Sequence, residues 1–307
     1  MESNTNPVRI GLALSGGGAR AIAHLGVLQV LEEHGIPISI IAGTSMGAYI
    51  GGSYAAGASL NAIEEVVSDI GSHKILTWGN FNILRESLIK PNKMEDHWRP
   101  LVGDTLTENT KIPFSATATD LESGKEVDLS SGPLIKVMMA SGAYPTIFPP
   151  VFLNEHYLID GGILNYIPVN MIRDKCDIVL AVDLESQSAR QFISAMAYDK
   201  FYRQLSGWRK ILHFKRWITS QWRLNLLLMA NIVVRTIDIA RRETFERKLF
   251  EGRPDLLIVP ETEGYPFFGF KFYKELIQAG RDSMEKYMPL LKAMIVDEQK
   301  KKESASV

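Results

Sequence analysis

The pentapeptide Gly43-Thr44-Ser45-Met46-Gly47 constrains the fold of this chain more than any other segment. It follows an apolar stretch, 38–42, typical of a buried strand, and precedes a run of small residues, 48–56, typical of a closely packed helix. A strand that turns sharply into a helix exposes its corner residue, and glycines on both sides avoid Cβ clashes there. We therefore expect Ser45 at the exposed corner of a nucleophile elbow, with the two glycines supporting it.

A glycine run marks a second strand-to-helix junction, upstream of the first. Residues 9–14 predict a strand, Gly16, Gly17 and Gly18 follow it, and apolar residues then recur near the helical period over 22–31. Several backbone N–H groups exposed at a helix N-terminus favour negative charge. The bound group is then either a phosphate or the oxyanion of an acyl-transfer intermediate.

The phosphate interpretation has some support, because Gly16-x-Gly18-x-x-Ala21 matches a dinucleotide-binding fingerprint. That fold needs an acidic residue about 20 positions further on, and residues 36–43 contain none. A P-loop is also excluded, since no Lys-Ser or Lys-Thr follows the glycines. The run therefore favours oxyanion binding, with a tight structural turn as the alternative.

An acidic residue closes a third apolar strand, 157–159, where Asp160 is followed by Gly161 and Gly162. A serine nucleophile needs a base, usually a histidine held by an acid. Of the six histidines, His213 alone follows Asp160, and it lies in a basic, tryptophan-rich stretch.

The remaining histidines give no better candidate. His24 is expected to be a packed or capping residue on the first helix, and His156 an exposed residue of a hairpin. Asp160 itself is then the best candidate base, in a dyad with Ser45. The alternative is an ordinary turn aspartate, which is common before glycine.

Together these motifs resemble the patatin-like phospholipases, especially the bacterial members and the catalytic domain of neuropathy target esterase. The resemblance covers most of residues 8–186 and rests on segments 15–20, 24–28, 43–47, 140–145, 148–150 and 160–162. It implies that Ser45 is the nucleophile, Asp160 the general base, and the amides of Gly16, Gly17 and Gly18 the oxyanion donors.

Arg20 also belongs to the motif that the resemblance identifies. An ordinary ion pair on a helix surface is an equally good interpretation of this residue. The glycine that commonly follows it in the family is Ala21 here, which is also small.

Strand and helix patterns alternate along the chain, which favours a layered α/β fold with a mainly parallel central sheet flanked by helices. With 307 residues, 46% of them hydrophobic, the chain can bury one large core. Further strands are expected at 112–120, 125–129, 151–153, 156–159, 177–182 and 256–259, and helices at 60–70, 134–141, 169–175 and 271–294. We expect a catalytic region at 9–173, completed by 177–186 and 254–296, a helical insertion at 188–250, and a polar, frayed or disordered tail at 297–307.

The net charge of −1 conceals a strongly basic segment. Residues 190–248 contain 13 Lys or Arg and four acids, so the segment carries +9 and the rest of the chain −10. It also holds Trp208, Trp217 and Trp222. A basic amphipathic helix bearing tryptophan suits an anionic membrane surface. The structural alternative is a helical hairpin folded onto the core, and no nucleic-acid-binding motif accompanies the charge.

Composition favours a reducing compartment, because the single Cys176 cannot form an intramolecular disulfide. No secretory signal and no run of membrane-spanning length are visible, so we expect a cytoplasmic protein, with peripheral binding to the inner face of a membrane as an option. A Ser–Asp dyad requires no metal or cofactor, and no Cys/His cluster has ligand spacing.

The sequence thus predicts a serine acyl hydrolase that acts on phospholipid or lysophospholipid esters. Two alternatives remain open at this stage. One is a lipid acyltransferase that passes the acyl group to an alcohol, and the other is a membrane-associated regulatory protein with a vestigial site. Oligomeric state cannot be read from these patterns.

Overall fold

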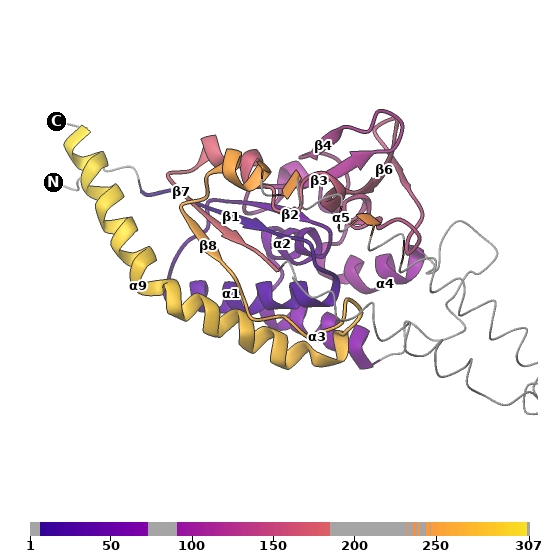
Figure 1. The fold of residues 1–307 in the computed structure, drawn as a ribbon, viewed down its shortest axis with the longest axis horizontal. Coiled ribbons are helices and arrows are strands. Elements are labelled where there is room, and N and C mark those ends of the chain that lie inside the picture. Colours follow the sequence, from indigo (N-terminus) through magenta and orange to yellow (C-terminus); the bar gives the residue numbers. More distant parts are fainter. Residues whose placement is uncertain are drawn as a thin grey trace, which may run out of the picture.

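An eight-stranded sheet forms the centre of the molecule (Figure 1). The computed structural model describes residues 7–72, 91–184 and 247–305, and a few positions between 232 and 245. The strands are β1 (Ile10–Leu14), β2 (Ile40–Thr44), β3 (Phe114–Asp120), β4 (Glu126–Leu129), β5 (Val151–Leu153), β6 (His156–Asp160), β7 (Ile178–Val182) and β8 (Leu256–Ile258).

The strand order is β5-β6-β3-β2-β1-β7-β8, with β4 paired to β3 outside this path. The five strands from β3 to β8 in this order pair in parallel, and β4, β5 and β6 join in antiparallel pairs. The layered α/β fold with a mainly parallel central sheet is therefore confirmed.

The described helices are α1 (Ala23–Glu33), α2 (Met46–Ala56), α3 (Leu60–Ser72), α4 (Pro91–Val102), α5 (Leu134–Ser141) and α9 (Tyr273–Ala305). Short 3-10 turns connect the elements: η1 (Gly18–Ile22), η3 (Thr107–Asn109), η4 (Gly161–Ile163), η5 (Val169–Met171), η6 (Arg173–Lys175) and η7 (Phe270–Phe272). Helix α4 was not predicted, because its sequence is polar and contains Pro100. The helix expected at 169–175 is instead the pair of turns η5 and η6.

The two faces of the sheet carry side chains of different size. On one face the large residues of β1, Ile10, Leu12 and Leu14, pack with α1 and α2 in the main core. On the other face, small residues such as Ala13 and Ala42 meet the segment around η5 and η6 in a second core. Alternation along each strand separates these two sets, and the small face lets an irregular segment lie close to the sheet.

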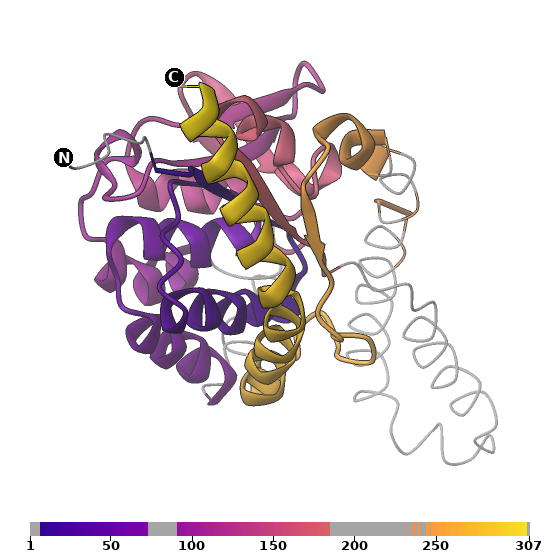
Figure 2. The same cartoon turned by 90° about the vertical axis from the view of Figure 1, so that its left-hand side faces the viewer.

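Helix α9 runs across the molecule and packs along α1 (Figure 2). It extends to Ala305, so the expectation of a frayed or disordered tail at 297–307 is wrong over residues 297–305. Lys302 explains the order of this end, since its ammonium group donates to the Asp177 carboxylate at 2.5 Å and to the Pro7 carbonyl at 3.1 Å.

Two glycines allow the close approach of α1 and α9. A Cβ at Gly26 would lie 2.0 Å from the Ile277 carbonyl oxygen, and one at Gly280 would lie 1.9 Å from that of Ala23. Backbone atoms at both contacts cannot rotate away as a side chain could. The helices would therefore have to separate to admit a methyl group.

Gly280→Ala should destabilise the protein by about 2 kcal/mol or more, because overpacking outweighs the roughly 1 kcal/mol by which alanine favours a helix over glycine. Urea denaturation would measure this. Lys286→Ala, an exposed position on the same helix, is the control and should change stability by less than about 0.5 kcal/mol. An unchanged midpoint for Gly280→Ala would show that the helix contact is adaptable.

Candidate active site

Ser45 occupies the corner between β2 and α2, at the N-cap of the helix. Its φ of 54° and ψ of −125° lie in a sparsely populated region that costs roughly 1–3 kcal/mol for a residue with a side chain. A Cβ at Gly47 would lie 2.5 Å from the Ser15 carbonyl oxygen, and one at Gly43 would lie 2.7 Å from the Ala48 Cα. Both flanking positions therefore require glycine, for the steric reason that the sequence suggested.

The register of β3 brings Asp160 to this corner. Thr117 pairs with Thr44 of β2, and the next residue, Ala118, pairs with Asp160 of β6. Strand β4 pairs with both Thr117 and Ala118, so it occupies one edge of β3 at these positions. Strands β2 and β6 must share the other edge, where their carboxyl ends meet at consecutive positions, about 3.8 Å apart along β3.

Asp160 is buried, with 1% of its surface exposed, and several hydrogen bonds fix it. Its Oδ1 accepts from the Gly162 amide at 2.7 Å, its own amide donates to the Ala143 carbonyl at 3.0 Å, and its carbonyl accepts from the Thr119 hydroxyl at 3.1 Å. A Cβ at Gly161 would lie 2.2 Å from the Thr117 carbonyl oxygen. The two glycines thus let the chain after Asp160 turn tightly against β3.

The glycine loop lies directly beside the elbow. A Cβ on Gly16 would be 3.4 Å from the Ser45 Cβ. Gly17 and Gly18 have positive φ values of 141° and 58°, which glycine adopts without strain. Over the described ranges, no backbone carbonyl accepts from the Gly17 or Gly18 amide.

The amide of Gly16 is directed elsewhere, since it donates to the Tyr166 carbonyl at 3.2 Å. This corrects the expectation that all three glycine amides serve as oxyanion donors. The Gly16 amide instead connects the loop to the segment that follows Asp160. The amides of Gly17 and Gly18 remain as candidate oxyanion donors.

Two residues of the first helical turns, Arg20 and His24, form hydrogen bonds with backbone carbonyls of this loop. His24 is fully buried, and its Nε2 lies 2.9 Å from the Ser15 carbonyl oxygen, so that nitrogen carries the proton. Burial lowers the pKa of His24 to about 4, and the hydrogen bond to Ser15 opposes this only in part. His24 is a packed residue, as predicted, and it is neutral at physiological pH.

Arg20 is also buried, with 9% exposed, and its Nε–H donates to the Gly17 carbonyl at 3.5 Å. This position contradicts the alternative of an ion pair on a helix surface. Its guanidinium group therefore places a permanent positive charge behind the peptide that joins Gly17 to Gly18.

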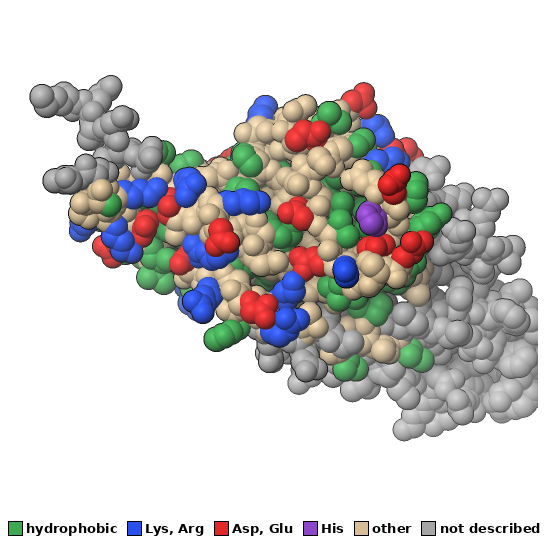
Figure 3. Space-filling view, turned by 90° about the horizontal axis from the view of Figure 1, so that it is seen from above, with side chains coloured by type: hydrophobic (Ala, Val, Ile, Leu, Met, Phe, Trp, Pro, Cys, Tyr) green, Lys and Arg blue, Asp and Glu red, His purple; other side chains and the backbone are tan. Residues whose placement is uncertain are grey.

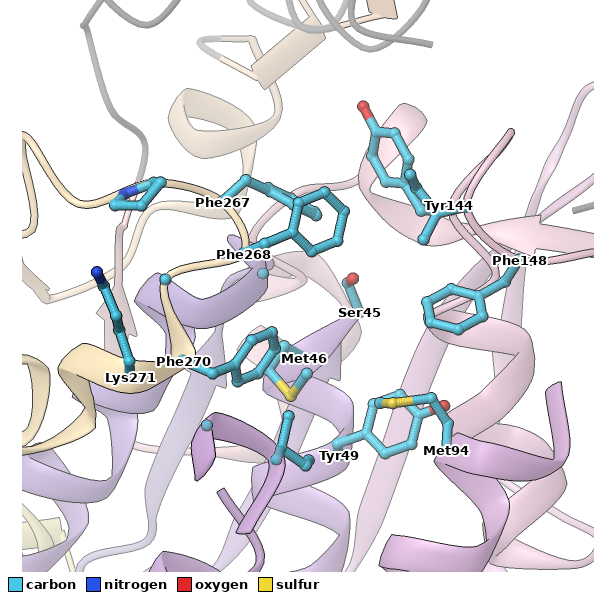
Figure 4. A pocket seen from close by; sticks show the side chains of 17 residues that line it. Ser45, Met46, Tyr49, Met94, Tyr144, Phe148, Phe267, Phe268, Phe270 and Lys271 are labelled. Carbon is cyan, nitrogen blue, oxygen red and sulfur yellow. The ribbon is translucent and has the colours of Figure 1, made fainter. Parts of the chain in front are cut away.

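An apolar pocket of about 240 Å³ opens above Ser45, whose hydroxyl points into it (Figure 4). Its walls come from α2, α3, α4, the loop after α5, and residues 266–271. The labelled lining residues are Met46, Tyr49, Met94, Tyr144, Phe148, Phe267, Phe268, Phe270 and Lys271. This wall was not predicted from the sequence, although the aromatic cluster Phe267-Phe268-Gly269-Phe270 is a visible signal.

The aromatic wall is connected to the glycine loop. The Ala19 amide donates to the Phe267 carbonyl at 2.8 Å, and a Cβ on Gly18 would lie 2.5 Å from the same oxygen. Tyr49, on the opposite wall, is buried, which raises its pKa, and the negative charges of Asp160 and Glu95 raise it further. Apart from Lys271, the pocket therefore presents mainly a neutral phenol and hydrophobic side chains.

No other histidine within the described ranges is placed to assist Ser45. His156 is 49% exposed and lies 3.3 Å from the Asp120 carboxylate, as expected for a hairpin residue, and His213 lies outside the residues described. In those same ranges, no group of three or more His, Cys, Asp or Glu side chains could hold a metal ion.

Comparison with known proteins gives consistent matches. Residues 12–172 match the family model described as "Patatin-like phospholipase". The chain is 38% identical over 182 residues to an uncharacterized NTE family protein of Mycobacterium tuberculosis, covering 59% of this chain and 50% of that protein. It is 31% identical over 278 residues to the lysophospholipase NTE1 of Saccharomyces cerevisiae, covering 89% of this chain and 16% of the yeast protein. The chain therefore spans half or less of these relatives.

A solved structure shares the fold. VipD from Legionella pneumophila superposes with a TM-score of 0.51 at 16% sequence identity, over 94% of this chain and 68% of that one. At this identity the likeness concerns the fold alone.

The buried neutral His24 should make stability depend on pH. Its pKa falls from 6.5 to about 4 on folding, so the unfolded chain binds the extra proton between these values, and stability is lost as pH falls from 6.5 towards 4. The loss is about 3 kcal/mol at 1.36 kcal/mol per pKa unit. Urea denaturation of the wild type and of His24→Gln over this range should show a shallower dependence for the variant. If the free energy of unfolding depends on pH in the same way in both proteins, protonation of His24 does not destabilise the fold.

Proposed function

Because the chain belongs to the patatin-like phospholipase family, we propose that it is a serine acyl hydrolase that cleaves phospholipid or lysophospholipid esters with Ser45 and Asp160. One observation carries the proposal: β2 and β6 end at consecutive positions along the same edge of β3. This register supports the proposal, because the strained serine and the buried carboxylate follow from adjacent positions of β3, and the serine lines an apolar pocket.

The chemistry follows from the groups at this corner. Asp160 accepts the proton of Ser45 while the serine Oγ bonds to the acyl carbonyl carbon. The amides of Gly17 and Gly18 donate to the resulting oxyanion, and the N-terminus of α2 adds partial positive charge. The tetrahedral intermediate collapses, and the leaving alcohol takes the proton from Asp160. Water then attacks the acyl-serine by the same route, releasing a fatty acid and restoring the Ser45 hydroxyl.

The pocket favours an acyl chain as the group bound next to Ser45. Its walls are mainly aromatic and aliphatic, and the Ser45 hydroxyl points into it. Burial of such a chain contributes about 0.8 kcal/mol of binding free energy for each CH₂ group, so long acyl chains should bind more tightly than short ones. The name of the yeast relative, a lysophospholipase, is consistent with a lipid that carries a single chain.

Ser45→Ala and Asp160→Asn should each abolish hydrolysis of a lysophospholipid while leaving the protein folded. The two groups act as a unit, so the double variant should be hardly slower than either single one. Fatty-acid release followed by mass spectrometry measures this, and circular dichroism checks the fold. Near wild-type turnover in Asp160→Asn would rule out the dyad.

Fluorophosphonate labelling separates an active enzyme from a protein with a vestigial site. Covalent modification at Ser45, absent in Ser45→Ala, is the expected result. If the wild type is not labelled, the serine is not activated and the proposed hydrolase function fails. Adding an alcohol acceptor to the lysophospholipid reaction distinguishes hydrolysis from acyl transfer, because a transferase gives a new ester instead of free fatty acid.

The protein is also proposed to bind anionic membranes through the segment 190–248. Most of that segment lies outside the described residues, including its three tryptophans, so the argument rests on its charge of +9. On the face seen in Figure 3, acidic and basic side chains of the described part are interspersed. Among the helices described, none has the length and hydropathy to cross a membrane.

Binding to anionic vesicles should be strong at low ionic strength and weaken steeply with salt, since each basic residue contributes about 1 kcal/mol near such a surface. Reversing the charges of Arg209, Lys210, Lys215 and Arg216 together should release the protein. Hydrolysis of a soluble short-chain ester should persist. Co-sedimentation with anionic and neutral vesicles tests this. If the wild type and the charge-reversal variant pellet equally with both lipids, the segment does not bind membranes and the alternative of a hairpin folded onto the core is favoured.

A further inference from the structure

The dipeptide Asn165-Tyr166 forms hydrogen bonds with three segments of the site: the elbow, the glycine loop and the turn after Asp160. The Thr44 hydroxyl, one residue before the elbow serine, donates to the Asn165 carbonyl at 3.0 Å. The Gly16 amide donates to the Tyr166 carbonyl at 3.2 Å, and the Asn165 amide donates back to the Gly161 carbonyl at 2.8 Å. The position of this dipeptide therefore controls how the elbow, the glycine loop and the Asp160 turn lie relative to one another.

The side chain of Asn165 is completely buried and anchored by two acceptors. Its Nδ2 donates to Glu126 Oε1 at 2.6 Å and to Asn170 Oδ1 at 2.8 Å. A carboxylate can only accept, so Glu126 fixes which end of the Asn165 amide faces it. Hydrogen bonds to a charged group are about twice as strong as neutral ones, which makes Glu126 the dominant partner.

Glu126 is in turn held by the basic segment. Its Oε2 forms an ion pair with the Lys248 ammonium group, and both side chains are 21% exposed. One turn earlier, Phe245 packs edge-on against the Tyr166 ring, with centroids 5.9 Å apart and an interplanar angle of 78°. Phe245 therefore contacts Tyr166 directly, and Lys248 is linked to Asn165 through Glu126.

We propose that Glu126 and Lys248 are positioning residues for the hydrolase reaction, which hold Ser45, the glycine loop and Asp160 in register through Asn165 and Tyr166. The end of the basic segment is then part of the active-site framework. This gives the segment a function beyond membrane contact, and any movement of residues 244–252 would change the geometry of the dyad. The kinetic part of the inference rests on the proposed function.

Lys248→Met should lower kcat for a soluble short-chain ester by about 10- to 100-fold with KM unchanged, because a displacement on the order of 1 Å has that effect on a reacting pair. Arg247→Met is the matched control: Arg247 is its neighbour, 61% exposed, and paired only at the surface with Glu251. It should keep wild-type kcat. Lys248→Arg should restore most of the rate, since it keeps the ion pair.

The two members should also be coupled. Glu126→Gln combined with Lys248→Met should be no slower than the slower single variant, because both changes break the same pair. Equal kcat in Lys248→Met and Arg247→Met, or a double defect equal to the product of the single ones, would overturn the proposal.

Hydrogen exchange gives a test that needs no activity. Amides in peptides covering 14–18 and 160–166 should exchange faster in Lys248→Met than in Arg247→Met, and identical exchange in the two variants would contradict the positioning role. If the wild type hydrolyses no ester, the proposed function fails, while the exchange measurement still decides whether Lys248 orders the loops.

Discussion

The site depends on the fact that one edge of β3 accommodates two strands that approach from opposite directions. Strand β2 pairs with β3 up to Thr117, and β6 takes the next position, Ala118, with its last residue. Strand β2 cannot continue without colliding with Asp160. The chain must therefore leave the sheet at Ser45 in a sharp turn that strains the serine, and the proposed mechanism pairs this serine with the carboxylate at the end of β6.

Side chains on the two faces of the sheet differ in size, which explains how the segment 165–176 lies so close to the strands. On the second face β1 carries Gly11 and Ala13 and β2 carries Ala42, and a Cβ at Gly11 would lie 2.5 Å from the Cys176 sulfur. Large side chains there would hold the segment 165–176 away from the strands. Asn165 could then no longer accept from Thr44, and the hydrogen bonds that join the loops would be lost.

Local motifs were predictable because each depends on residues that are consecutive in the sequence. The corner at Ser45, the loop of Gly17 and Gly18, and the strand that ends at Asp160 lie where the sequence places them. The proposed pairing of Asp160 with Ser45 depends on the register of β3, which no local pattern reveals. The lack of a suitable histidine and the family resemblance led to that prediction instead.

Contacts between distant segments were the part that sequence reasoning missed. The aromatic wall at 266–271 became part of the pocket through a backbone hydrogen bond between Phe267 and Ala19, residues that share no pattern. The same holds for the engaged amide of Gly16, whose acceptor, the Tyr166 carbonyl, lies 150 positions along the chain. The polar end of α9 was predicted to be disordered because its anchor, Asp177, lies far away in the sequence.

The surroundings of the proposed dyad are consistent with a buried carboxylate in place of the usual histidine. Burial and nearby negative charge raise the pKa of Tyr49, and burial lowers that of His24, so both are neutral at physiological pH. The positive potential for an oxyanion must then come from fixed groups: the loop amides, the N-terminus of α2 and the permanently charged Arg20. None of these groups loses a proton when Asp160 gains one. In the proposed mechanism, the electrostatic support of the transition state is therefore independent of the proton that moves between Ser45 and Asp160.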